Sequence, residues 1–206
     1  IVLHELCHSL VGRHYGLPIA GIKLFIFGGV AEMEDDPPSP KAEFLMAIAG
    51  PAFSIVFAGV LQILFKIGSH FEFPVVVNGV VGYLSELNFV LGIFNLLPGF
   101  PLDGGRILRS CLWWWKKDLV WATDIASKGG VALGFVMIFF GILFFIQGNF
   151  IGGIWMAVLG LFLQSLSKMS YESLLVSEFF HGQPIGKYAK KNVVTLPSHI
   201  TIQNVV

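Results

Sequence analysis

Four long apolar segments constrain the fold of this chain more than any other feature. Residues 44–65, 74–97, 131–147 and 150–166 carry almost no charge, and a helix of roughly 20 apolar residues is long enough to cross the hydrocarbon core of a bilayer. Only 13% of the 206 residues are charged, against about 25% in a typical soluble domain. The formal net charge is zero, so the composition gives no indication of a nucleic acid partner.

The segments between these runs complete the expected architecture. Residues 1–12 have the character of the C-terminal half of a membrane helix, and Gly148-Asn149 is short enough to join the last two apolar segments in a helical hairpin. Residues 19–34 are rich in β-branched and aromatic residues, which favours a small β-hairpin or sheet at the membrane edge. We therefore expect an all-α polytopic membrane protein with about five helices in this sequence.

The basic residues predict an orientation in the membrane. If residues 13–43 are cytosolic, alternation of the spans also places residues 98–130 and the residues after 167 in the cytosol. Of the 13 lysines and arginines, only Lys66 then lies on the opposite side, in agreement with the excess of Lys and Arg in cytoplasmic loops. The sequence thus predicts a multi-pass protein of the cell membrane with a cytosolic C-terminus.

The opening segment, IVLHELCHSLVG, carries ionisable residues where apolar side chains are expected. In a helix, His4 and His8 lie on one face, so their imidazoles can bind one metal ion, with Glu5 beside them as a general base for water. This short pattern also occurs by chance, and a histidine in an apolar helix often only completes the packing. The high cost of ionisable groups in a membrane segment favours the metal site. Cys7 lies on another face, which favours a packing role.

A catalytic zinc site needs a third protein ligand and an open fourth position. The segment NLLPGFPLDGGRILRS, residues 95–110, offers Asp103 directly after two prolines that interrupt a membrane helix. Asp103 also fits a helix cap in an ordinary loop, and the local pattern alone favours that alternative. The predicted depth in the membrane favours Asp103 as a metal ligand. His8 precedes Arg13 by about 7 Å along a helix, and Asp103 precedes Arg106 by three residues. The predicted orientation therefore places all candidate ligands near the cytosolic face.

Together these motifs resemble the site-2 protease family of intramembrane zinc metalloproteases. The resemblance rests on HELCH, FGGVAE, the Ala-Gly-Pro sequence at 49–51 and N-x-x-P-x-x-P-L-D-G-G, and it extends from residue 1 to about residue 168. The family has members with a six-helix core, which implies one further helix before Ile1. One position departs from the family pattern, because Ser54 follows the Ala-Gly-Pro sequence where the family often carries Asn.

The resemblance implies a role for each matching residue. His4, His8 and Asp103 become the ligands of one zinc ion, and Glu5 becomes the base that activates water. Asn95 matches an asparagine that helps to position the scissile carbonyl or to stabilise its oxyanion.

Two further segments acquire expected roles in the same way. Gly28 and Gly29 match a membrane-edge strand whose exposed edge pairs with an unwound substrate. Residues 187–206, KYAKKNVVTLPSHITIQNVV, resemble the first strand and helix start of a CBS domain, and such domains commonly bind adenine nucleotides in pairs. We therefore divide the chain into a protease core at residues 1–168, a linker at 169–186 and the start of a truncated CBS domain at 187–206.

The sequence thus predicts an intramembrane zinc endopeptidase that performs regulated hydrolysis of transmembrane segments in membrane-anchored regulatory proteins. The expected partners are a zinc ion, a transmembrane protein substrate and membrane lipid, and a homo-oligomer is left open. The alternative is a non-proteolytic, CBS-regulated membrane protein or an inactive homologue that binds transmembrane partners. The four apolar segments exclude a soluble zinc protease.

Overall fold

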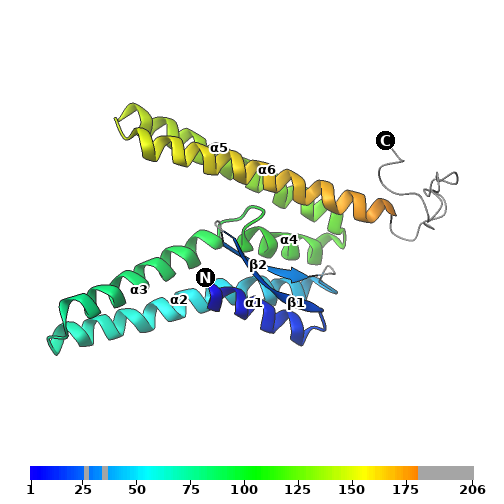
Figure 1. Ribbon diagram of the computed structural model, residues 1–206. Helices are drawn as coiled ribbons and strands as arrows, with labels where there is room; N and C mark the ends of the chain where they lie inside the picture. Colours follow the sequence, from blue (N-terminus) through cyan, green and yellow to red (C-terminus); the bar gives the residue numbers. More distant parts are fainter. Residues whose placement is uncertain (26–27, 34–36, 181–206) are drawn as a thin grey trace, which may run out of the picture.

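The computed structural model describes residues 1–25, 28–33 and 37–180, which form six helices and two strands (Figure 1). In chain order these are α1 (Val2–His14), β1 (Ile19–Phe25), β2 (Gly28–Met33), α2 (Pro40–His70), α3 (Val75–Asn95), α4 (Asp103–Lys116), α5 (Leu119–Ile146) and α6 (Phe150–Phe180). Two long helical hairpins, α2–α3 and α5–α6, diverge from a common end (Figure 1). At that end lie α1, α4 and the two strands.

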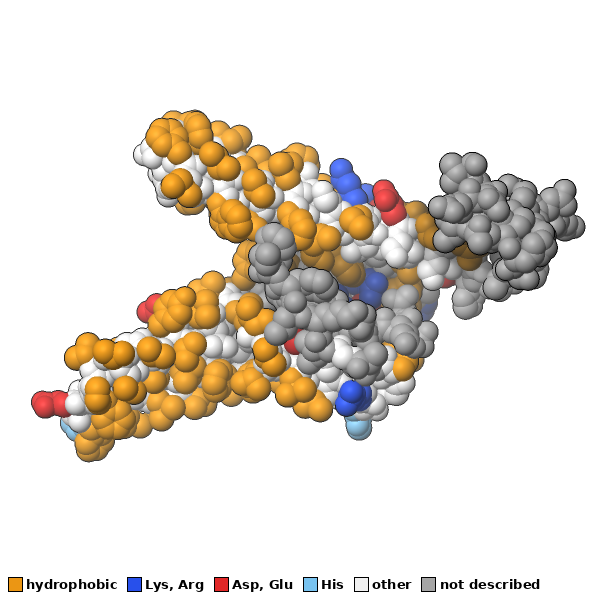
Figure 2. Space-filling model, in the orientation of Figure 1, with side chains coloured by type: hydrophobic (Ala, Val, Ile, Leu, Met, Phe, Trp, Pro, Cys, Tyr) orange, Lys and Arg blue, Asp and Glu red, His pale blue; other side chains and the backbone are white. Residues whose placement is uncertain are grey.

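Within the described residues, four helices are long and apolar enough to cross a membrane: α2, α3, α5 and α6. They correspond to the four spans that the sequence predicts, whereas α1, with 13 residues, is not one of them. Apolar side chains cover both hairpins, and on the face shown Lys and Arg gather toward the end where the hairpins converge (Figure 2). Val76 and Ile151 are 78% and 86% exposed. Such extensive apolar surface is typical of a helix surrounded by lipid.

Local side chains determine where three of the spanning helices begin. Ser39 and Asp118 each accept a hydrogen bond from a backbone N–H in the first turn of α2 and α5, at 3.2 and 2.9 Å. Asn149 does the same for α6 at 3.1 Å. Gly148 has a φ of 89°, which a glycine adopts without strain, and it reverses the chain between α5 and α6. The short turn therefore joins these two helices in a hairpin, as the sequence predicts.

Three of the spanning helices are longer than the sequence predicts, and α2 extends over Pro40–His70 rather than 44–65. α5 begins at Leu119 rather than at 131, and α6 continues to Phe180 rather than ending at 166, so part of the predicted linker is helical. The added turns contain polar residues, which a hydropathy pattern counts against a span. Two of these residues bond to the backbone of their own helix: the Thr123 hydroxyl donates to the Leu119 carbonyl at 2.8 Å, and the Ser170 hydroxyl donates to the Leu166 carbonyl at 2.9 Å.

The helix α4 is not among the elements that the sequence predicts. Its 14 residues combine a buried side, formed by Gly104, Gly105, Arg109 and Ser110, with an exposed side that includes Trp115. The buried side packs against α2 and α5. The chain therefore does not run from the interrupted span directly to the next one but first forms this amphipathic helix.

The loop between α3 and α4 is held by the backbone and small residues of the α5–α6 hairpin. The Phe100 N–H donates to the Ala126 carbonyl at 3.2 Å, and the Ser167 hydroxyl donates to the Phe100 carbonyl. A Cβ at Gly130 would collide with that same carbonyl, so only glycine allows the loop to lie so close to α5. An interrupted helix in an apolar protein needs such partners for its backbone, and they fix the point from which α4 starts.

The two strands form an antiparallel pair that lies against α1. Gly28 pairs with Phe25 and Gly29 with Leu24, and the register is irregular between Ile19 and Gly21. The segment at 187–206, which the sequence assigns to a CBS domain, lies outside the described residues.

Candidate metal centre

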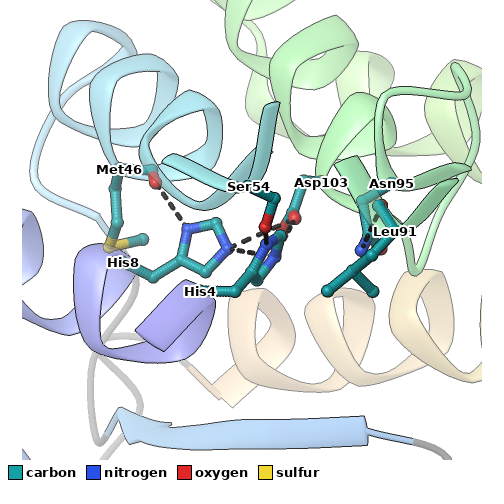
Figure 3. A network of polar contacts seen from close by, with 7 residues as sticks. All are labelled: His4, His8, Met46, Ser54, Leu91, Asn95 and Asp103. Carbon is teal, nitrogen blue, oxygen red and sulfur yellow. Dashed lines mark hydrogen bonds and ion pairs between the residues drawn. The ribbon is translucent and has the colours of Figure 1, made fainter. Parts of the chain in front are cut away.

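The helix α1 presents His4 and His8 on one buried face. The two side chains are one helical turn apart, they are 3% and 6% exposed, and their Nε2 atoms are 3.1 Å apart (Figure 3). Leu3, Leu6 and Leu10 of the same helix are exposed. The helix therefore turns its imidazoles toward protein and its leucines outward, which is the distribution expected in an apolar environment.

Asp103 joins the two histidines from the first turn of α4. Its Oδ2 atom lies 3.1 Å from Nε2 of His4 and 3.2 Å from Nε2 of His8, and we call these three residues the His-His-Asp cluster. Asp103 is the first residue inside α4, and the N-cap position is occupied by Leu102, so Asp103 is not the helix cap that the local sequence pattern favours. Burial raises the pKa of Asp103, but hydrogen bonds and charges of the two histidines outweigh burial and lower the pKa below its usual value. The ionised form that a metal ligand requires is therefore favoured.

The helix α2 supplies a second partner to each imidazole. His8 Nδ1 donates to the Met46 carbonyl at 2.7 Å, and His4 Nδ1 lies 2.9 Å from the Ser54 hydroxyl (Figure 3). Because a carbonyl can only accept, the contact with Met46 places a proton on Nδ1 of His8, and neutral His8 then directs the lone pair of Nε2 into the cluster. Ser54, at the position that departs from the family pattern, thus contacts a cluster histidine.

Gly50 makes room for both imidazole rings against α2. A Cβ at this position would overlap Nε2 of His8 and would lie 2.7 Å from Nε2 of His4. The packing of the two histidines therefore explains the glycine of the Ala-Gly-Pro sequence, since any side chain at Gly50 would occupy the space next to the donor atoms.

The donor set fits a zinc ion. Two imidazole nitrogens and one carboxylate oxygen, all within 4.8 Å of one another, are ligands typical of catalytic zinc sites. Donor atoms bound at 2.0–2.2 Å in a tetrahedral site lie about 3.3–3.6 Å apart. The separations of 3.1 and 3.2 Å in the His-His-Asp cluster are close to the lower end of this range. Three protein donors also leave a fourth position for another ligand.

Two other residues singled out in the sequence lie near the cluster. Glu5 is half-buried on α1, and its charge interacts with all three cluster residues. Asn95 is the last residue of α3, and its amide donates to the Leu91 carbonyl at 3.1 Å (Figure 3). The structure therefore places Glu5 beside the cluster and leaves Asn95 hydrogen-bonded to its own helix.

Comparison with known proteins identifies the family. The profile described as Peptidase family M50 matches residues 1–76 and 73–137. The chain belongs to this family. It is 32% identical to Rip3 of Mycobacterium tuberculosis over 206 residues, which are 100% of this chain and 52% of Rip3. It is 43% identical over 145 residues to the zinc metalloprotease MJ0392 of Methanocaldococcus jannaschii, which covers 69% of this chain and 40% of MJ0392.

A solved structure is similar to this M50 chain as well. The site-2 protease from Methanocaldococcus jannaschii superposes with a TM-score of 0.65 at 38% sequence identity, over 82% of this chain and 72% of that one. Family M50 and this structure confirm the predicted resemblance to site-2 proteases, and together with the four apolar helices they identify a membrane protein. The chain spans about half the length of Rip3.

The sequence does not predict what α2 contributes to the site of this M50 chain. The Ala-Gly-Pro sequence is a signal that Gly50 matters, but it does not say which atoms need the space. Ser54 follows Gly50 by one helical turn, so it could have been assigned to the same face. The Met46 carbonyl has no sequence signal, because every residue carries one.

Proposed function

We propose that this M50 chain is an intramembrane zinc endopeptidase that hydrolyses peptide bonds within transmembrane segments of membrane-anchored regulatory proteins. The proposal is carried by the His-His-Asp cluster, whose members come from two helices and meet at the end where two apolar hairpins converge. Ionisable groups are costly in such surroundings and usually have a function there. The zinc metalloprotease MJ0392 supports the same chemistry for this chain.

In this proposal the zinc ion is held by Nε2 of His4, Nε2 of His8 and the Asp103 carboxylate. Zinc supplies the Lewis acid of the reaction, since it lowers the pKa of water to about 7 and polarises a carbonyl. The Met46 carbonyl and the Ser54 hydroxyl keep the imidazoles in the orientation that binding requires.

Proton transfer belongs to Glu5. Its carboxylate takes a proton from the attacking water and returns it to the leaving amine. The Asn95 amide carries two N–H groups and uses one on the Leu91 carbonyl. The other can donate to the oxygen of the scissile carbonyl, where negative charge develops in the transition state.

The substrate has to unwind locally before it is cut, because a transmembrane helix satisfies its peptide groups internally. We assign the pairing of the unwound segment to the strand edge that contains Gly28 and Gly29, since an extended peptide can add to an exposed edge. The distribution of Lys and Arg supports a site near the cytosolic face. On that side we also place the C-terminal segment at 187–206, as the start of a CBS domain that binds adenine nucleotide at full length.

The test is Glu5→Gln in the full-length protein, purified in detergent and supplied with tagged single-span membrane proteins. We expect the variant to keep its zinc and to lose cleavage by at least about 100-fold, because only the proton acceptor is removed. Glu86→Gln, which changes an exposed glutamate on α3, is the matched control and should cleave as wild type. Unchanged cleavage in Glu5→Gln, or wild-type protein without zinc, would favour the non-proteolytic alternative.

A further inference from the structure

A second buried polar contact joins α2 to α4, outside the His-His-Asp cluster. Glu43 of α2 is 0% exposed and Arg109 of α4 is 7% exposed. Nε of Arg109 donates to Oε1 of Glu43 at 2.6 Å, and a second guanidinium nitrogen contacts the same oxygen. The guanidinium also lies 5.0 Å from the centre of the Phe100 ring, in the loop before α4. Nε of Arg106, also on α4, lies 4.0 Å from the same Glu43 oxygen. The Glu43–Arg109 pair therefore joins α2 to α4 and to the loop before α4.

Stability alone is a weak reason for such a pair. Removing two charges from water costs as much as their attraction returns, and apolar replacements are often as stable. The second oxygen of Glu43 is buried without a hydrogen-bond partner, which adds to the cost. Because the buried ion pair is costly, a role in fixing the position of α4 relative to α2 is the better explanation.

One face of α2 carries both the pair and the partners of the histidines. Glu43, Met46, Gly50 and Ser54 follow at intervals of three and four residues, which places them along one side of the helix. Packing joins α1 to α2 and α2 to α4, and in the described part of the chain no comparable packing joins α1 to α4. The distance from Asp103 to the two histidines is therefore set through α2.

We propose that the Glu43–Arg109 ion pair positions Asp103 for zinc. The proposal rests on the proposed function, because it requires Asp103 to be a zinc ligand. Arg109 follows Asp103 by six residues, or about 9 Å along α4. Phe100 precedes Asp103 by three residues. Holding α4 at Arg109 while the loop is held at Phe100 fixes both the rotation of the helix and its position along its axis. Glu43 and Arg109 are thus positioning residues that act through Asp103.

The experiment measures zinc affinity of the full-length protein in detergent by competition with a chromophoric chelator. Glu43→Gln, which keeps the shape and removes the charge, should raise the Kd for zinc by about 10- to 100-fold, the effect typical of lost support around a metal ligand. Two controls should leave the Kd within about twofold. Asp124→Asn removes the exposed pair with Lys128, and Ser85→Ala removes a buried hydrogen bond between α3 and α2.

The decisive comparison repeats Glu43→Gln in an Asp103→Asn background. If the ion pair acts through Asp103, adding Glu43→Gln to Asp103→Asn causes no further loss of zinc affinity. An equal further loss in both backgrounds would overturn the proposal, because the pair would then support the fold in general. In the same way, Glu43→Gln combined with Arg109→Gln should be no worse than the more severe single variant.

The failure of this proposal can be told apart from that of the proposed function. If Asp103→Asn leaves zinc affinity unchanged, the ligand set is wrong. If Asp103→Asn weakens zinc binding and Glu43→Gln does not, only the positioning role fails. Should Glu43→Gln not fold, the double variant Glu43→Leu with Arg109→Met removes both charges at once. Its zinc affinity should also fall, and a wild-type Kd in that variant would overturn the proposal.

Discussion

The two helical hairpins are similar in length and apolar surface, but they serve the site in different ways. The hairpin α2–α3 contributes atoms that contact the histidines and Arg109, all from one face of α2. The hairpin α5–α6 contributes Gly130 and Ser167, which hold the loop before α4 through the Phe100 carbonyl. The hairpin α2–α3 contacts both the histidines and the helix that carries Asp103, whereas the hairpin α5–α6 supports the loop before that helix. Changes in α2 should therefore act on zinc binding, whereas changes in α5–α6 should act mainly on stability.

The largest effect is expected for Gly50→Ala on α2. The added methyl group would overlap the ring of His8 and crowd Nε2 of His4, so both donor atoms must move. We expect zinc content to fall below detection and peptide cleavage to be lost. Gly59→Ala on the same helix is the matched control, because nothing lies within 4 Å of its Cβ position. Metal analysis of both purified variants makes the comparison, and normal zinc in Gly50→Ala would contradict the role assigned to α2.

A smaller effect on the same side of the comparison is expected for Ser54→Ala. The variant removes the hydroxyl 2.9 Å from Nδ1 of His4 and leaves the ring without its outer partner. Loss of such a partner lowers metal affinity by about 10- to 100-fold, which chelator competition would measure. Ser85→Ala removes a buried hydroxyl elsewhere in the hairpin and should leave the affinity unchanged. If the two variants bind zinc equally, the contact with Ser54 does not support His4.

The smallest effect on zinc is expected for Ser167→Ala on α6. Ser167 Oγ lies within hydrogen-bond distance of the Phe100 and Leu163 carbonyls, and its single proton bonds to one of them at a time. Loss of the hydroxyl should lower the free energy of unfolding by about 1 kcal/mol. Zinc affinity should stay within about twofold of wild type, because the loop keeps its bond to the Ala126 carbonyl. Thermal unfolding and zinc competition on the same sample separate the two quantities. If Ser167→Ala lowered zinc affinity as much as Ser54→Ala, the two hairpins would not differ in their effect on zinc binding.

Sequence patterns predict those features of this molecule that depend on regular spacing along the chain. Hydropathy predicts the four spanning helices, and the four-residue spacing predicts that His4 and His8 share a face. The proximity of Asp103 follows from the predicted depth of the spans, and the structure brings the three side chains together. Their role as zinc ligands stays a prediction.

The remaining features depend on contacts between distant segments. The helix α4 has two glycines in its first turn, which disfavour a helix by propensity, and it forms because its buried side packs against α2 and α5. Ser54 and the Met46 carbonyl meet the histidines across intervals of 50 and 38 residues. A pattern within one segment carries no information on such pairings. The polar turn at the start of α5 is not predicted for a related reason, since the Thr123 hydroxyl finds the Leu119 carbonyl only once the helix has formed.

The central claim is that two imidazoles and one carboxylate bind a single zinc ion, and X-ray absorption at the zinc edge tests it directly on the purified full-length protein. We expect nitrogen and oxygen ligands at about 2.0–2.2 Å from the zinc ion, with the scattering of two imidazoles. A sulfur atom at about 2.3 Å would contradict the central claim, because the ion would then be bound by a cysteine such as Cys7 and not by the His-His-Asp cluster.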